Sequence, residues 1–125
     1  EKNIFGLEIF LKNIPKPNKK TRVSKKNYIT SDFQKSERDF AFVIDKTFKV
    51  GELEDIIKKI DINIVKKVIA FDVFEGQNIP QDKKSVAINV VIQSQDKTLT
   101  EYDLDQISQK IINAVKEKTG ATIRS

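Results

Sequence analysis

Residues 85–95 read SVAINVVIQSQ, and this stretch decides the fold class. Its side chains alternate with a period of two, which is typical of a β-strand with one buried face. One alternate set is wholly apolar and is predicted to face a core: Val86, Ile88, Val90 and Ile92. The other set is predicted to face away from it: Ser85, Ala87, Asn89, Val91 and Gln93.

The segments around this strand complete a regular order of elements. Further strands are predicted at residues 38–45, 64–75 and 121–124, and helices at 50–60 and 101–118. Thr100 can cap the second helix with Asp103 at the capping-box distance, and Gly120 is placed to end it. From residue 38 the order is β-α-β-β-α-β, which predicts an α+β ferredoxin-like sandwich with two helices on one face of a four-stranded antiparallel sheet.

Alternation also assigns the faces of the other strands. The residues predicted to face the helices are Phe40, Phe42, Ile44, Ile69, Phe71, Val73 and Ile123. The residues predicted to face the open side are Ala41, Val43, Val68, Ala70, Asp72, Phe74, Thr122 and Arg124. Residues 4–11 alternate loosely and are predicted to form an additional N-terminal strand.

The predicted open face gathers groups suited to a flat, hydrogen-bonding ligand. They are Phe74, Asp72, Ser85 and Arg124 around the small residue Ala41. An exposed ring can stack a nucleic-acid base, a carboxylate can accept from guanine's two Watson–Crick donors, and arginine can donate to a carbonyl or phosphate. The spacing alone leaves a second interpretation open, in which Phe74 is covered by another segment and Asp72 pairs with a lysine.

Composition excludes several classes of function. The chain contains no Cys and no His. It therefore lacks thiolate nucleophiles and zinc–thiolate sites, the commonest general base and the commonest metal ligand. No apolar run is long enough for a membrane span. We predict no catalytic, metal or cofactor-binding residues, and we interpret Asp103 and Asp105 as solvated helix surface.

The excess positive charge belongs to the first third of the chain. Residues 1–38 carry ten Lys or Arg and four Asp or Glu, whereas residues 39–125 carry thirteen and fourteen. The basic stretch 12–38 also contains Pro15 and Pro17, which predicts an extended connector. It is interpreted either as an arm that contacts phosphates or as a solubilising linker.

Five motifs in order resemble one known family. They are RDFAFVID at 38–45, FDVFEG at 71–76, KSVA at 84–87, KTLT at 97–100, and a final Arg124. Together they resemble the ferredoxin-fold anticodon-binding domain that closes the β subunit of bacterial phenylalanyl-tRNA synthetases. The resemblance covers about residues 31–124. It implies that residues 1–30 are the tail of a preceding β-subunit domain plus a basic linker, and that residues 31–125 are the anticodon-binding domain.

The resemblance implies recognition of the tRNA-Phe anticodon loop, above all of its first base, guanine. Phe74 matches the aromatic residue that stacks on this base, although the family more usually has Tyr there. Asp72, Ser85 and Arg124 match residues that hydrogen-bond to it. Ala41 matches the small residue beneath the base.

The resemblance also implies a role in a larger enzyme, phenylalanine–tRNA ligase. Its partners would be tRNA-Phe, the remaining β-subunit domains and the α subunit in an α2β2 assembly, in the cytoplasm and away from membranes. ATP and Mg²⁺ would serve the catalytic site in the α subunit, with no cofactor in this chain. Two alternatives stay open. One is a structural docking module that uses Val43, Val68 and Val91; the other is a small-molecule regulatory domain of the ACT type, which shares the element order.

Overall fold

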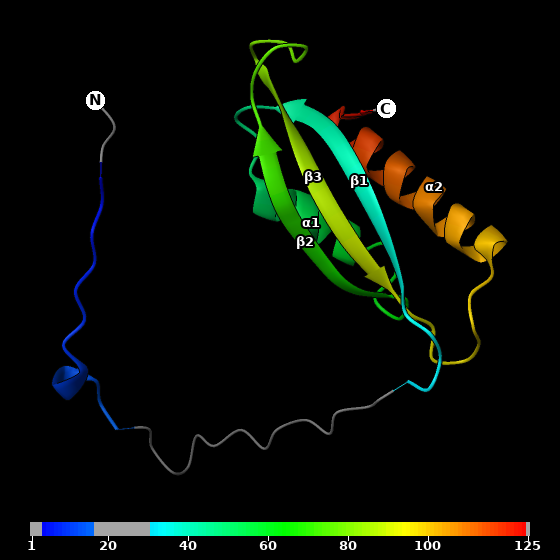
Figure 1. Cartoon of the computed structure of the whole chain (residues 1–125), viewed down its shortest axis with the longest axis horizontal. Helices are drawn as coiled ribbons and strands as arrows, with labels where there is room; N and C mark the ends of the chain where they lie inside the picture. Colours follow the sequence, from blue (N-terminus) through cyan, green and yellow to red (C-terminus); the bar gives the residue numbers. More distant parts are fainter. Residues whose placement is uncertain (1–3, 17–30, 125) are drawn as a thin grey trace.

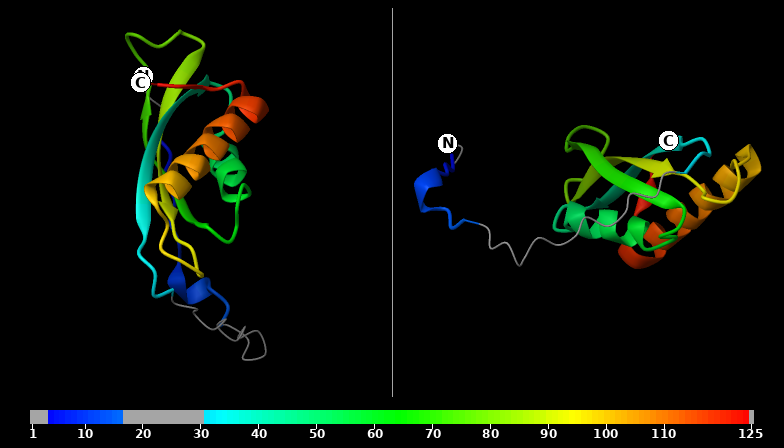
Figure 2. Two further views of the ribbon diagram at one scale, coloured as in Figure 1. Left: turned by 90° about the vertical axis from the view of Figure 1, so that its right-hand side faces the viewer. Right: turned by 90° about the horizontal axis from the view of Figure 1, so that it is seen from below.

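A computed structural model describes residues 4–16 and 31–124. Its elements are a short 3-10 helix η1 (Leu11–Asn13), β1 (Ser36–Asp45), α1 (Val50–Lys58), β2 (Val65–Phe74), β3 (Lys83–Ile92), α2 (Glu101–Thr119) and β4 (Thr122–Ile123). The strands form one antiparallel sheet in the order β2-β3-β1-β4 (Figure 1). Seen from the side, α1 and α2 lie together on one face of the sheet (Figure 2). The predicted ferredoxin-like sandwich is confirmed.

The core lies between the sheet and the two helices. On the central strand β3, the four residues predicted to face inward are fully buried: Val86, Ile88, Val90 and Ile92. The helices contribute Leu53, Ile57, Leu104, Ile107, Ile111 and Val115. Burying one such side chain stabilises the fold by about 1.5–3 kcal/mol relative to its exposed state. Apolar stripes on the helices therefore fix them to the sheet.

Helix α2 has defined signals at both ends. The Thr100 hydroxyl accepts from the Asp103 N–H at 3.2 Å, and the Asp103 carboxylate accepts from the Thr100 N–H at 2.9 Å. The predicted capping box is thus confirmed. The Thr100 N–H, followed by the Lys97 ammonium, lowers the pKa of Asp103 to about 2. At the other end, Gly120 is left-handed with φ 66°, as its predicted role requires.

Strand β2 differs from the predicted alternation. Its pairing with β3 shifts between Val65 and Lys67 and again between Ala70 and Asp72. Val68 therefore lies opposite Val90 and is buried at 4% exposure, whereas alternation predicts that it faces outward. The reason is that each β-bulge inserts one extra residue and exchanges the two faces of the strand beyond it.

Three residues at or just before the second bulge have faces other than those predicted, and the predicted faces return only beyond it. Ala70 lies opposite inward-facing Ile88, so its outward prediction is wrong. Ile69 lies opposite Asn89 and faces outward, so its inward prediction is wrong as well. Phe71 is the extra residue and is 59% exposed, not buried in the core as predicted. Beyond it, Asp72 and Phe74 lie on the open face.

The N-terminal strand predicted at residues 4–11 does not form. Residues 4–10 have no regular structure, and Leu11–Asn13 is a single 3-10 turn. A strand needs a hydrogen-bonded neighbour, and within the described residues the sheet contains only β1 to β4. Most of the predicted connector, residues 17–30, lies outside the described residues.

Arg38, the first residue of the RDFAFVID motif, has a structural contact. It lies opposite Val90 in the ladder, on the side of the sheet that the helices cover. Its guanidinium lies 2.6 Å from the carboxylate of Glu101, the first residue of α2. This ion pair joins β1 to the start of α2, so one basic side chain of the 12–38 stretch is used within the domain.

Candidate nucleic-acid interface

The five predicted site residues lie in two neighbouring rows across the open face of the sheet. Residues directly opposite each other in an antiparallel ladder project to the same face. The pairing places Phe74, Ser85, Val43 and Thr122 in one row. It places Asp72, Ala87 and Ala41 in the next, and the Arg124 N–H extends this row by donating to the Ala41 carbonyl at 2.7 Å. The structure therefore brings together residues from all four strand segments.

The middle of the row from Asp72 to Arg124 carries only short side chains. Its two middle residues are Ala41 and Ala87, whose side chains end at Cβ. Neighbouring strands lie about 4.8 Å apart, so the backbones of the two charged residues are separated by roughly 14 Å. Asp72 and Arg124 thus stand at opposite ends of a row whose middle is a shallow floor of two alanines.

The Arg124 side chain crosses this floor. Its guanidinium carbon lies 5.6 Å from the centroid of the Phe74 ring, within the range of a cation–π contact. Two strands, β3 and β1, lie between β2 and β4 in the sheet order. The contact is possible because the alanines between them place no side chain in its way. In the free domain, therefore, one side of the aromatic ring is occupied by the arginine.

The Phe74 ring also packs over Gly76, the last residue of the FDVFEG motif. A Cβ atom at Gly76 would lie 2.9 Å from Cζ of the ring and 3.4 Å from Cε1. Real Cβ atoms do not approach that closely, so any larger residue here would displace the ring. Gly76 thus sets the position of Phe74, which is 43% exposed.

Ser85 is on the predicted face but is covered. It lies between Phe74 and Val43 in its row and is only 5% exposed. A hydroxyl this deep meets a ligand only after a neighbouring side chain moves. Asp72, in contrast, is exposed, and no described ion pair involves it. The alternative that Asp72 pairs with a lysine is therefore not supported by the described part of the chain.

Charged side chains lie at both ends of the open face. At one end, the Asn89 amide donates to Asp39 at 2.8 Å and to Glu37 at 3.3 Å, so two carboxylates are exposed there. At the other end, the β2–β3 loop forms a hollow of about 550 Å³ that Lys46 and Lys83 help to line. The C-terminus lies at this same end of the sheet (Figure 1). Lys46 is paired with Glu75 at 3.2 Å, and Lys67 lies in the same row as Glu37, so both ends of the face carry mixed charge.

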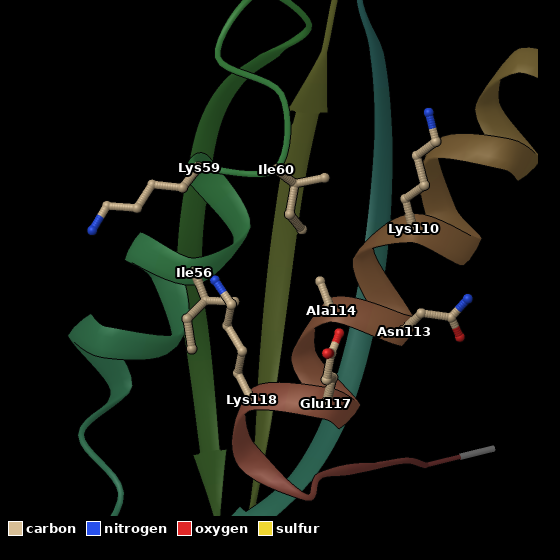
Figure 3. A pocket seen from close by; sticks show the side chains of 8 residues that line it. All are labelled: Ile56, Lys59, Ile60, Lys110, Asn113, Ala114, Glu117 and Lys118. Carbon is tan, nitrogen blue, oxygen red and sulfur yellow. The ribbon is translucent and has the colours of Figure 1, made fainter.

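The opposite side of the domain has a different character. A shallow hollow of about 400 Å³ lies between α1 and α2, and its lysines Lys59 and Lys110 extend away from the apolar side chains (Figure 3). Its lining is Ile56, Lys59, Ile60, Lys110, Asn113, Ala114, Glu117 and Lys118. A single carboxylate among lysines offers no acid–base pair. The described residues contain no acidic cluster that could hold a metal ion, and no helix among them is long and apolar enough to cross a membrane.

Three residues that contact the site or the strand bearing it were not singled out from the sequence. Ala87 belongs to the outward set of β3, but only the register reveals that it lies beside Ala41. Gly76 stands in a motif, and its contact with the ring depends on how Phe74 folds back. Glu54 lies on α1, and its side chain accepts from the Ala70 N–H at 2.9 Å. No periodicity in the sequence predicts that contact.

Comparisons with known proteins identify the family of this domain. Residues 31–124 match the family model described as the ferredoxin-fold anticodon binding domain. Three curated relatives, each a phenylalanine–tRNA ligase beta subunit, cover 97–98% of this chain: from Rickettsia felis (39% identical), Mesorhizobium japonicum (38%) and Bradyrhizobium diazoefficiens (37%). The chain spans about 15% of the length of these relatives. The chain therefore belongs to the ferredoxin-fold anticodon binding domain family.

Proposed function

We propose that the open face binds the anticodon loop of tRNA-Phe and selects guanine at its first position. The observation that carries this proposal is the alignment of Asp72, Ala87, Ala41 and Arg124 in one row beside the Phe74 ring. A base stacked on an aromatic side chain gains about 1–3 kcal/mol. The Asp72 carboxylate accepts from the two donors on the Watson–Crick edge of guanine, and adenine offers a different pattern there.

Binding requires Arg124 to exchange partners. In the free domain its guanidinium lies against the ring that the base uses. When a purine stacks on Phe74, Arg124 leaves the ring face and donates to the base carbonyl or to a phosphate. The Ser85 hydroxyl, covered between Phe74 and Val43, supplies a further hydrogen bond once one of these side chains moves as the base binds. Ala41 and Ala87 form the floor under the base.

We further propose that this domain supports aminoacylation by a larger phenylalanine–tRNA ligase, whose partners include the rest of the β subunit and an α subunit in the cytoplasm. ATP and Mg²⁺ belong to the catalytic centre of that assembly. The apolar side chains before the domain support contact with the rest of the polypeptide, because Ile4, Phe5 and Leu7 are 87–94% exposed. Such a row of exposed apolar residues indicates a surface that a partner covers.

One argument for the alternative docking role of the open face, an exposed patch of three valines, does not hold for one of them. Val68, one of three valines predicted to offer an apolar patch, is buried in the core. The family match likewise favours RNA over the ligand of a small-molecule regulatory domain.

The direct test is titration of the 125-residue chain with anticodon stem-loops that carry guanine or adenine at the first anticodon position. Phe74→Ala is expected to weaken binding of the guanine stem-loop about 5- to 100-fold, the equivalent of one lost stack. Asp72→Ala is expected to reduce the guanine preference while much of the affinity remains. Tyr102→Ala is the control, because Tyr102 is an exposed aromatic on α2, outside both rows and away from the β2 bulge.

The outcomes distinguish the two roles clearly. Equal affinity for the two stem-loops in the unaltered chain, or equal losses in Phe74→Ala and Tyr102→Ala, would contradict selection of guanine on this face. No binding at any salt concentration would favour the docking role.

A further inference from the structure

The two residues that face the proposed guanine site owe their orientation to one irregularity in β2. Val68 and Ala70 point into the core, opposite Val90 and Ile88. If regular alternation continued from there, Asp72 and Phe74 would point toward the helices as well. The extra residue Phe71 exchanges the faces, so that Asp72 lies opposite Ala87 and Phe74 opposite Ser85. Whatever stabilises this bulge also stabilises the site.

One side chain from the helical layer reaches this point. Oε1 of Glu54, on α1, accepts from the Ala70 N–H at 2.9 Å, directly before the extra residue. The other carboxylate oxygen, Oε2, lies 3.4 Å from Lys58 Nζ, one helical turn further on. The Glu54 side chain is only 25% exposed. Hydrogen bonds to a charged acceptor in such partly buried places are among the stronger ones in proteins.

We infer that Glu54 is a positioning residue for the RNA site, because it fixes the β2 bulge that turns Asp72 and Phe74 onto the open face. It touches no ligand, since it lies among the helices on the other side of the sheet. Its effect passes through the Ala70 N–H and along two residues of backbone to Asp72. The inference rests on the proposed function only where guanine preference is measured; the amide exchange and the chemical shift test it independently.

Three substitutions at Glu54 separate the effect of side-chain length from the effect of charge. Glu54→Gln keeps an acceptor oxygen at the same distance but has no charge, Glu54→Asp keeps the charge but is one methylene shorter, and Glu54→Ala has neither. Lys58→Ala is the control for the second contact of the carboxylate. Hydrogen exchange of the Ala70 amide measures the bond itself. The chemical shift of the Gly76 α-protons, referred to Phe74→Leu, reports the position of the ring that packs on them.

We expect Glu54→Ala and Glu54→Asp to speed exchange of the Ala70 amide about tenfold or more, as loss of one charge-assisted bond predicts. The chemical shift of the Gly76 α-protons should move toward its value in Phe74→Leu. The preference for guanine over adenine should fall about fivefold, because only part of the free energy of the lost hydrogen bond reaches the RNA site. Glu54→Gln should fall between the unaltered chain and Glu54→Ala, because it keeps the acceptor oxygen but loses the charge. Lys58→Ala should stay within about twofold of the unaltered chain, because it keeps both.

Two results would overturn the inference. The first is an unchanged Ala70 exchange rate and Gly76 shift in Glu54→Asp; the second is a guanine preference in Glu54→Gln that falls as far as in Glu54→Asp. If the unaltered chain shows no guanine preference at all, the proposed function fails. The exchange rate and the shift then still decide whether Glu54 holds the bulge.

Discussion

The absence of a side chain at Gly76 gives the Phe74 ring its place. Gly76→Ala would put a Cβ atom 2.9 Å from the ring carbon Cζ, so the ring must move. We expect this variant to weaken binding of the guanine stem-loop by roughly 5-fold or more, because a displaced ring loses part of its stack. Calorimetric titration measures the effect. A variant that binds as tightly as the unaltered chain would show that the ring is not held by this contact.

The face of each site residue could be predicted from the sequence to different degrees. Ala41 and Ser85 follow from clean alternation in their own strands. Asp72 and Phe74 are predicted on the correct face, but the prediction extends a regular alternation that is wrong for Val68 and Ala70. The contact of Arg124 with Phe74 joins residues about fifty positions apart across two strands, and only the folded sheet reveals it.

At the scale of elements, helix α2 ends at Gly120, whose left-handed backbone conformation is unfavourable for residues that carry a Cβ atom. Gly120 has φ 66° and empty space where a Cβ would lie, so Gly120→Ala introduces backbone strain without a clash. We expect a loss of about 1 kcal/mol in the free energy of unfolding, measured by urea denaturation. Gly51→Ala is the opposite control, since Gly51 is helical and also unobstructed, and should stabilise the domain slightly. Equal effects of the two changes would contradict the conformational argument.

The capping box of α2 makes stability depend on acid. The pKa of Asp103 is lowered from 3.8 to about 2 by the Thr100 N–H and the Lys97 ammonium. A carboxyl with a lower pKa in the folded state stabilises it above about pH 4, and this contribution is lost as the pH falls toward about 2. We therefore expect Asp103→Asn to lower the Tm at about pH 6, and the difference from the unaltered chain to shrink between about pH 4 and pH 2.

Asp105→Asn provides the comparison for this titration. Asp105 is exposed on the same helix and takes no part in the capping box. A difference in Tm between Asp103→Asn and the unaltered chain that stays constant down to about pH 2 would contradict the assignment.

The element order could be predicted because each strand and helix has its own periodicity and end signals. The bulges in β2 could not, since an extra residue changes no residue type and only the pairing with β3 exposes it. The expected strand at residues 4–11 failed for a related reason. Its alternation predicts a strand, but a strand forms only beside a partner.

At the scale of the whole molecule, most of the excess positive charge precedes the folded domain in the sequence. Lys19, Lys20, Arg22, Lys25 and Lys26 precede it in the basic stretch. If this stretch is an arm on the RNA, changing all five to Gln should make the slope of log K against log salt less negative by about 0.7 for each phosphate that is no longer neutralised. The guanine preference should not change, because phosphates carry no base identity. An unaltered slope would assign the stretch to the role of a linker.

Arg124 is attached through the shortest strand of the fold. Two ladder pairs, Phe42 with Ile123 and Val43 with Thr122, precede its single bond to Ala41. Fraying of so brief an element costs far less free energy than global unfolding. The guanidinium can therefore swing away on a terminal hinge while the rest of the sheet stays intact. Pinning that hinge, for instance by an RNA phosphate, would slow amide exchange in β4 and at Arg124 but not in β2 or β3.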